Sequence, residues 1–269
     1  MYSSNLLKRV GESMKINKPL FLEFKKYKNS LYDDIKVEFL YHSNKMEGST
    51  FTKEALYDVV ENNMIRGSHT IDDVMETVNS VDLFDRIIMD CGVPLTKELL
   101  FQYHSILKSR TSDEVNGLSG HYKTIMNRIS GSPVQVAYPK EVPSAMEELL
   151  EKWNTLNNVT LEDICAFHSR FEHIHPFQDG NGRLGRFIIL KQCIENDIDL
   201  IAIDDDFSEA YKLALERSQT QGDIKSLVQI LGHCQERLEK KLAPYKESIV
   251  LLENELKKGE EEENNEMEM

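Results

Sequence analysis

Apolar residues recur at helical spacing along most of the chain. Leu31, Ile35 and Phe39 recur every four residues, so residues 30–47 are predicted to form a helix with one buried face. Elsewhere a threonine often precedes such a segment, at the place where a side-chain oxygen caps a helix. The further predicted helices cover residues 53–63 after Thr52, 71–90 after Thr70, 97–109 after Thr96, 142–156, 161 to about 174 after Thr160, 182 onward, 207–218, and 223–256 with a break near Pro244.

One stretch, residues 121–138, has a different pattern. Val134 and Val136 alternate with polar or small neighbours such as Gln135, which is the period of a β-strand. A Gly-Ser pair supplies a turn, and Pro133 limits the pairing to a sheet edge. The predicted fold is therefore all-α with one β-hairpin.

Length and composition limit the class of protein. The 269 residues fit one domain with a small addition, and 40% of them are apolar, which is enough for a sizeable core. A net charge of −14 argues against nucleic acid as a partner, because binding phosphates requires basic residues. The four cysteines form no CxxC pair and are expected to be core thiols in a reducing compartment. No apolar run is long enough to span a membrane, and no signal peptide is visible. We therefore expect a soluble cytoplasmic protein that does not bind membranes.

Residues with catalytic chemistry are concentrated in His175–Arg186, HPFQDGNGRLGR. Gly180, Asn181 and Gly182 permit positive φ angles, so that successive N–H groups can point toward one anion. The helix predicted from Gly182 onward has its N-terminus here, where free N–H groups and the helix dipole favour negative charge. We therefore expect an anion site at this turn.

Charged side chains surround the predicted anion site. Arg183 and Arg186 share a helix face, and guanidinium groups match phosphate oxygens. Asp179 offers a hard carboxylate for a divalent metal, and His175 has the ordinary pKa of a base at neutral pH. Asp-Gly-Asn-Gly is also a common turn sequence. His173 with His175 could be half of a metal site, although no third His or Cys is near in sequence. The combination favours a phosphate site beside a histidine base.

The pattern HPFxDGNGRxxR, with all nine fixed positions matched, resembles the signature of the Fic family. Most members of that family transfer AMP from ATP to a Ser, Thr or Tyr hydroxyl of a protein. The resemblance implies ATP as co-substrate and Mg²⁺ as cofactor, with Mn²⁺ as an alternative. By motif position it implies these roles: His175 as general base, Asp179 as metal ligand, Gly180, Asn181 and Gly182 at the α- and β-phosphates, and Arg183 and Arg186 at the β/γ end.

A shorter motif lies upstream of this signature. Residues 43–48, SNKMEG, resemble the Fic inhibitory motif S/T-x-x-x-E-G/N, which supplies Ser43 and Glu47. Glu47 is in line with Leu40 and Ser43 on the predicted helix. The resemblance implies that Glu47 pairs with Arg186 and blocks the productive pose of the ATP γ-phosphate. It indicates the class with an N-terminal inhibitory helix.

The resemblance also implies roles for three other places. In Fic proteins a hairpin at residues 121–138 is the flap, whose edge receives the protein target by strand addition. Relatives commonly have Gly-x-aromatic-Arg where this chain ends the motif with Lys123, which keeps the charge but loses the guanidinium fork. Tyr211 and Gln219 resemble residues near the adenine, although the spacing is one residue off.

The predicted organisation has four parts: residues 1–29 as an N-terminal extension, 30–235 as a Fic domain with inhibitory helix 30–48 and flap 121–138, 236–258 as a helical extension, and 259–269 as a disordered acidic tail. The predicted function is protein AMP transfer, autoinhibited by Glu47. Self-modification and a homodimer stay open. The alternatives are transfer of UMP, phosphate or phosphocholine, removal of AMP by a hydrolase that uses Glu47, and a non-enzymatic interaction protein.

Overall fold

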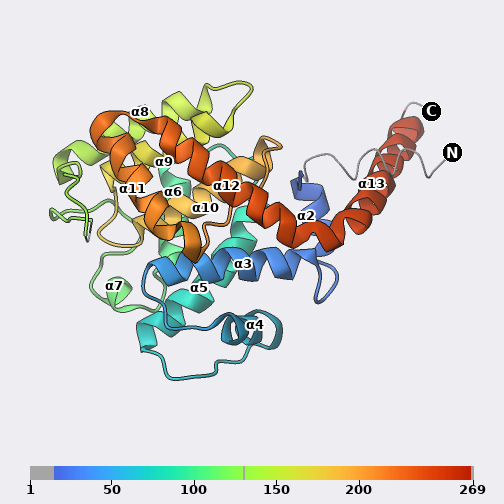
Figure 1. Cartoon of the computed structure of the whole chain (residues 1–269), viewed down its shortest axis with the longest axis horizontal. Coiled ribbons are helices and arrows are strands. Elements are labelled where there is room, and N and C mark those ends of the chain that lie inside the picture. The colour runs from blue at the N-terminus through green and yellow to red at the C-terminus, as the bar shows by residue number, and fades with distance from the viewer. Residues whose placement is uncertain (1–14, 130, 268–269) are drawn as a thin grey trace.

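Helix α10, Asn181–Glu195, runs through the middle of the molecule (Figure 1). Every one of its residues except Gly182 and Glu195 is buried, because α3, α5 and α9 pack around it. A helix that is apolar on most sides is typical of a core element. The N-terminus of this central helix is the turn in which the motif residues lie.

The computed structural model describes residues 15–129 and 131–267, except the side chains of 260–267. Its α-helices are α2 Lys18–Phe24, α3 Leu31–Met46, α4 Lys53–Asn62, α5 Ile71–Met89, α6 Lys97–Leu107, α7 Ser112–Val115, α8 Val142–Asn154, α9 Leu161–Ile174, α10 Asn181–Glu195, α11 Asp205–Gln221, α12 Ile224–Leu242 and α13 Lys246–Met267, and its 3₁₀ helices are η1 Pro139–Glu141 and η2 Ala243–Tyr245. The predicted all-α fold is confirmed.

Helix starts follow the predicted caps. The side chains of Thr52, Thr70, Thr96 and Thr160 each accept a hydrogen bond from the N–H three residues later, at 3.1 to 3.3 Å. These bonds satisfy N–H groups that have no partner inside the helix. The predicted break near Pro244 is also present, as η2 between α12 and α13.

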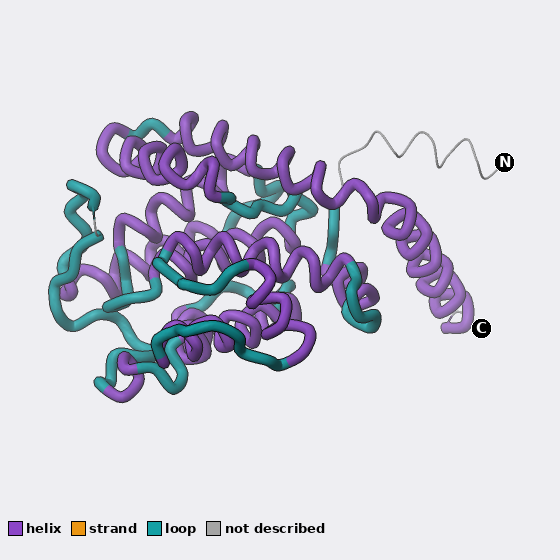
Figure 2. Tube along the Cα trace, turned by 60° about the horizontal axis from the view of Figure 1, so that its bottom comes forward, coloured by secondary structure: helices purple, strands orange, loops and turns teal. Residues whose placement is uncertain are grey.

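The β-hairpin prediction was wrong. None of the described residues is in a strand (Figure 2). The alternation itself holds, since Val134 and Val136 are buried while Gln135 is exposed. Residues 121–129 and 131–138 nevertheless form no strand, because the N–H groups of Lys123 and Ala137 donate to the end of α9 and to the loop that follows it, and not to a second strand. Lys123 N–H donates to Pro176 O at 2.8 Å, and Ala137 N–H to His173 O at 3.3 Å.

The ends of the chain differ from the prediction in one respect. Helix α13 projects from the body of the molecule (Figure 1), and its backbone is helical through residues 259–267, where we predicted a disordered tail. Residues 1–14 of the predicted N-terminal extension and 268–269 of the tail lie outside the described residues. In the described part of the chain, no helix combines the length and apolarity needed to cross a bilayer.

Candidate active site

His175 directly follows α9 and is held at the entrance to the motif turn. Its backbone is left-handed, with φ 51°, and its N–H donates to Phe171 O at 2.9 Å. The side chain is 14% exposed. Burial, helped by the charge of Lys123, lowers the pKa of His175 to about 4. The imidazole is therefore neutral at pH 7 and can accept a proton.

The turn that follows is fixed by one glycine and one amide. Gly180 has φ 78°, whereas Asn181 and Gly182 are already helical, so only the first of the three uses the positive φ that we predicted for all of them. Asn181 Oδ1 accepts from Phe177 N–H at 2.8 Å, and its Nδ2 donates to Phe177 O at 2.9 Å. The Asn181 side chain thus braces the loop, and the N–H groups of the first turn of α10 are directed out of the helix.

Arg186 contacts the two upstream motif residues. Its Nε donates to Ser43 Oγ at 2.9 Å, and its Nη2 donates to Ser43 O at 2.9 Å and to Glu47 Oε1 at 2.6 Å. Burial alone would raise the pKa of Glu47, but the charges of Arg186 and Arg183 lower it. Glu47 is therefore an ionised carboxylate that pairs with a guanidinium.

Glu47 also lies against the N-terminus of α10. It is the residue after α3, where the helix dipole disfavours a carboxylate. A Cβ added to Gly182 would overlap with Glu47 Oε1, so no larger residue fits between the two without a shift. The carboxylate is thus placed at the end of α10 that favours an anion, and it occupies the predicted anion site.

Arg183 is paired with a residue of α5. Its Nη1 and Nη2 donate to the two oxygens of Glu76, at 2.6 and 3.0 Å, and Nη2 lies 3.4 Å from Asp179 Oδ2. This is a bidentate guanidinium–carboxylate pair, the geometry that makes such contacts strong. Both motif arginines therefore bind glutamates.

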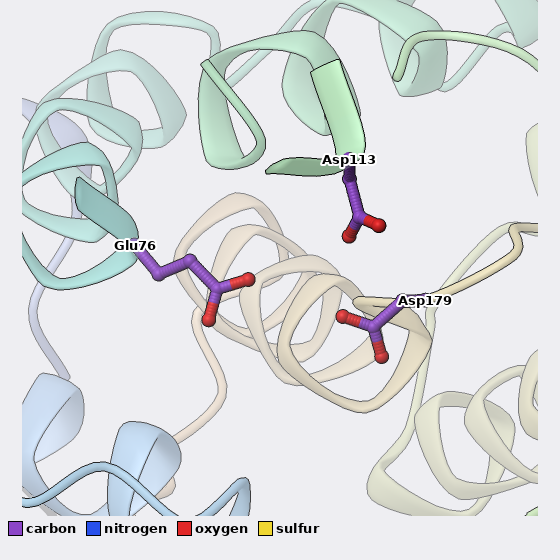
Figure 3. Close-up of side chains that lie close together, drawn as sticks. All are labelled: Glu76, Asp113 and Asp179. Atoms are coloured by element: carbon purple, nitrogen blue, oxygen red, sulfur yellow. The ribbon is translucent and has the colours of Figure 1, made fainter. Parts of the chain in front are cut away.

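Asp179 is the most exposed charged residue of the motif, with a side chain 58% exposed. Burial of its carboxyl would raise its pKa, but Lys108 and Arg183 lower it to about 2. The carboxylates of Glu76, Asp113 and Asp179 converge within 4.8 Å from α5, α7 and the motif loop (Figure 3). Lys108 Nζ binds all three. Hard oxygen ligands suit Mg²⁺, so Asp179 is able to hold one.

Several residues of this site were not predicted from the sequence. Lys108, the residue directly after α6, is 1% exposed, and His104 lies in the last turn of that helix. Gly120 N–H donates to His104 Nδ1 at 2.9 Å, so Nε2 carries the proton and donates to Asp179 O at 3.0 Å. Their only sequence signal was position. Leu100, His104 and Lys108 follow one another at intervals of four residues on a predicted helix. The two polar residues therefore lie on the same face as the buried Leu100.

Tyr211 and Gln219 lie away from the motif turn, whereas Lys123 lies beside it. Tyr211 is buried, and its hydroxyl is 2.6 Å from His168 Nε2. Gln219 donates to Ser169 O at 3.3 Å and lines a cavity of about 270 Å³ beside α9. Lys123 is buried near His175, and its Nζ donates to Asn127 Oδ1 at 2.8 Å. The structure thus brings the motif and the upstream Ser43 and Glu47 together, but places Tyr211 behind Arg186.

Comparison with known sequences agrees with the motif. Residues 94–193 match the Fic/DOC family. The protein adenylyltransferase Fic of Nematostella vectensis is 24% identical over 221 residues, which cover 74% of this chain and 47% of that protein. The protein of the same description from Drosophila melanogaster is 24% identical over 206 residues, covering 74% and 40%. The chain therefore spans about half the length of the curated relatives it matches.

Comparison with solved structures agrees on the fold. A Fic domain containing signaling protein from Bacteroides thetaiotaomicron superposes with a TM-score of 0.71 at 24% identity, covering 90% of this chain and 95% of that one. Fic-1 (aa134 - 508) from C. elegans has a TM-score of 0.65 at 14% identity, covering 95% and 71%. Residues 94–193 therefore match the Fic/DOC family, and the chain that contains them is a distant homologue of the protein adenylyltransferases named Fic.

Proposed function

We propose that this protein transfers AMP from ATP to a hydroxyl group of a protein and that Glu47 inhibits the transfer. The observation that carries the proposal is the joint placement of a neutral histidine, a helix N-terminus and two arginines at one turn. This arrangement supplies a base beside a phosphate-binding site. The relatives from Nematostella vectensis and Drosophila melanogaster are protein adenylyltransferases, which supports the same reaction class.

His175 acts on the attacking group. Its neutral imidazole accepts the hydroxyl proton while the oxygen attacks the α-phosphorus, and pyrophosphate leaves. The N–H groups at the start of α10 and the Arg183 and Arg186 guanidiniums hold the phosphate oxygens and offset the developing charge. A bound Mg²⁺ on Asp179 would neutralise phosphate charge. The fixed turn of Gly180 and Asn181 keeps these donors in place without ordering costs during the reaction.

Glu47 inhibits by occupying the place of a phosphate. Its carboxylate holds Arg186 and lies at the α10 N-terminus, so it takes both the cation and the dipole that a γ-phosphate needs. Its negative charge also repels the incoming triphosphate. A charge-assisted hydrogen bond contributes about 1.5–3 kcal/mol, so its removal is expected to raise productive ATP use by roughly 10- to 150-fold.

The test is transfer of labelled AMP from ATP in a cell lysate by wild type and the Glu47→Gly variant at equal ATP and Mg²⁺. We expect a labelled protein band with the variant and a much weaker band with wild type. Ser43→Ala should activate less, because its hydroxyl orients Arg186 without occupying the anion place. Glu61→Gly, on α4, is the matched control and should not activate. A folded Glu47→Gly variant with no more transfer than wild type would reject the inhibitory role.

The same assay separates the transferred group. Parallel reactions with labelled UTP, CDP-choline and γ-labelled ATP test transfer of UMP, phosphocholine and phosphate. Signal with one of these and none with α-labelled ATP would replace AMP by that group. No nucleotide binding by calorimetry, in wild type and Glu47→Gly alike, would instead favour an interaction protein.

One observation supports hydrolysis of the modified target as a second activity. Glu47 is ionised and about a third of its side chain is exposed, so it can activate a water molecule at the phosphate turn. The test is release of AMP from a target that Glu47→Gly has modified. Release by wild type but not by Glu47→Gly assigns this second role to Glu47.

A further inference from the structure

Two buried polar side chains lie together at the C-terminal end of α9, one in its last turn and one directly after it. Glu172 is 5% exposed, and its Oε1 has no hydrogen-bond partner. His175 Nδ1, one turn later, also has none. Glu172 Oε2 and His175 Nδ1 are 3.8 Å apart. Buried polar groups are nearly always hydrogen-bonded, so an unpaired carboxyl beside an unpaired ring nitrogen indicates a functional arrangement.

The surroundings keep Glu172 in this place. A Cβ on Gly185 of α10 would lie 2.5 Å from Glu172 Oε1 and 2.9 Å from His168 Cε1. A larger residue at position 185 would therefore require the carboxyl of Glu172 and the ring of His168 to shift. The backbone conformation at position 185 does not require a glycine, because the residue lies inside a regular helix. Its role is to let α10 approach the two polar side chains of α9.

We propose that Glu172 is a positioning residue for His175. When ionised, its carboxylate faces Nδ1 as an acceptor, keeps the proton on that nitrogen, and leaves Nε2 as the atom that accepts the proton of the target hydroxyl. The hydroxyl proton goes to Nε2, the Nδ1 proton stays where it is, and Glu172 takes up no proton. A separation of 3.8 Å exceeds a hydrogen bond, but such contacts are often long before substrate binds and tighten in the complex. The catalytic part of this proposal rests on the proposed transfer.

The groups around the pair define its titration. Burial raises the pKa of Glu172 to about 8; Arg186 lowers it and Glu47 raises it. Burial also lowers the pKa of Lys123, which faces His175, to about 8. The remaining neighbours do not titrate near pH 8, because the pKa values of His168 and Asp179 are lowered to about 3 and about 2, that of Glu47 is lowered and that of Tyr211 is raised. Only Glu172 and Lys123 thus change charge beside the ring between pH 7 and pH 9.

The experiment follows the His175 ring by nitrogen NMR with labelled histidine, assigned by loss of the signal in His175→Ala. It uses the full chain in the Lys123→Arg background, where the neighbouring cation no longer titrates near pH 8. We expect the Nδ1 shift to move in a step near pH 8 as Glu172 ionises. Glu172→Gln should abolish that step, and Glu162→Gln, on the exposed side of the same helix, should leave it unchanged.

A step that persists in Lys123→Arg with Glu172→Gln, or no step in Lys123→Arg alone, overturns the proposal. If Lys123→Arg does not fold, the comparison is made in wild type, where Glu172→Gln must reduce the step by at least half. The readout needs no nucleotide, so it stands whether or not the chain transfers AMP. Where transfer is measurable, Glu172→Gln should lower kcat at least tenfold at pH 8.5 and change KM for ATP less than twofold. A higher KM for ATP with an unchanged kcat would contradict the positioning role.

Discussion

At the scale of single residues, the motif separates a residue that moves a proton from residues that hold phosphate. His175→Ala should abolish transfer by the activated Glu47→Gly enzyme and leave ATP binding nearly intact. The imidazole acts on the hydroxyl, whereas phosphate contacts come from α10. Calorimetry with ATP and Mg²⁺ checks this. A loss of ATP affinity of more than about tenfold, roughly 1.4 kcal/mol, would make His175 a binding residue instead.

Lys108 is the counter-ion of three carboxylates, so its removal should change how the site responds to divalent cations. Glu76, Asp113 and Asp179 lie within 4.8 Å of one another, and Lys108→Met would remove the cation that all three contact. We expect Mg²⁺ to raise the Tm of Lys108→Met by more than it raises the Tm of wild type, because repulsion among the carboxylates is relieved by the ion.

The matched control for this experiment is Lys152→Met, on the exposed side of α8. Its Tm should respond to Mg²⁺ as wild type does. An equal Mg²⁺ effect in Lys108→Met and wild type would remove Lys108 from the cation site. The measurement is thermal unfolding with and without Mg²⁺ and needs no substrate.

The sequence showed the motif residues but not the residues that hold them. Fixed spacing along one turn makes His175–Arg186 readable, because all members act within a few residues of each other. Glu76 and Lys108 reach the same site from α5 and α6. Charged residues of this kind are equally typical of solvent-exposed helix faces. Only the packing of these helices against α10 shows that the two side chains lie in the site and not on the surface. Glu172 was similarly hidden as a helix residue before the histidine.

At the scale of elements, α3 carries Glu47 and is attached to the C-terminal helices. Glu38 of α3 is 5% exposed. Its carboxylate contacts His42 on the same helix, Lys53 of α4 and Lys241 of α12. Asp34 of α3 accepts from Tyr245 Oη at 2.6 Å, in η2. These contacts hold α3 more than two turns before Glu47, so we expect them to affect how firmly Glu47 is held against α10.

We expect the double variant Lys241→Ala with Tyr245→Phe to raise basal AMP transfer by a few fold. Without these contacts α3 is less firmly held, so Glu47 leaves Arg186 more often; exposed or half-exposed ion pairs contribute only about 0.2–1 kcal/mol each. The readout is labelled AMP transfer with Lys240→Ala as the control on the same helix. Unchanged transfer at a lowered Tm would mean that α12 stabilises α3 without affecting Glu47.

Helices were more predictable than the loop over the site, for a physical reason. Caps and apolar periodicity are local, so Thr52, Thr70, Thr96 and Thr160 mark helix starts without tertiary information. A strand requires a partner, and alternation in 121–138 only predicts which side chains are buried. Here the partners are two single carbonyl groups, that of His173 in the last turn of α9 and that of Pro176 in the motif loop. No pattern within 121–138 specifies that pairing.

At the scale of the whole molecule, buried ionisable groups determine how stability depends on pH. Burial lowers the pKa of His104, His168 and His175 to about 4, 3 and 4, well below the ordinary value of 6.5. Between about pH 4.5 and 6.5 the unfolded chain therefore binds up to three more protons than the folded chain at these positions. Stability at these sites is fully present above pH 6.5 and is lost as the pH falls.

Glu172 acts in the opposite direction. Its pKa of about 8, raised by burial from 4.5, means that the folded chain holds one proton that the unfolded chain has lost between these values. Stability from this group therefore falls as pH rises from 4.5 to 8. Between pH 4.5 and 6.5 the proton held by folded Glu172 offsets one of the three protons that the histidines bind only in the unfolded chain. Between pH 6.5 and 8 the histidines no longer contribute, and Glu172 alone changes the stability among these four groups.

These opposed shifts predict a maximum of stability near pH 6.5 that Glu172→Gln removes. In wild type the free energy of unfolding should rise by up to roughly 2.7 kcal/mol per pH unit below the maximum and fall by up to roughly 1.4 kcal/mol per unit between pH 6.5 and 8, since one proton corresponds to about 1.36 kcal/mol per unit. In Glu172→Gln the fall should disappear and the rise below pH 6.5 should become steeper, because three protons are no longer offset by one. Urea unfolding at half-unit steps from pH 4.5 to 8.5 measures both slopes. A decline above pH 6.5 that is equal in wild type and Glu172→Gln would show that Glu172 is ionised in the folded protein, and that another group sets the alkaline side of the profile.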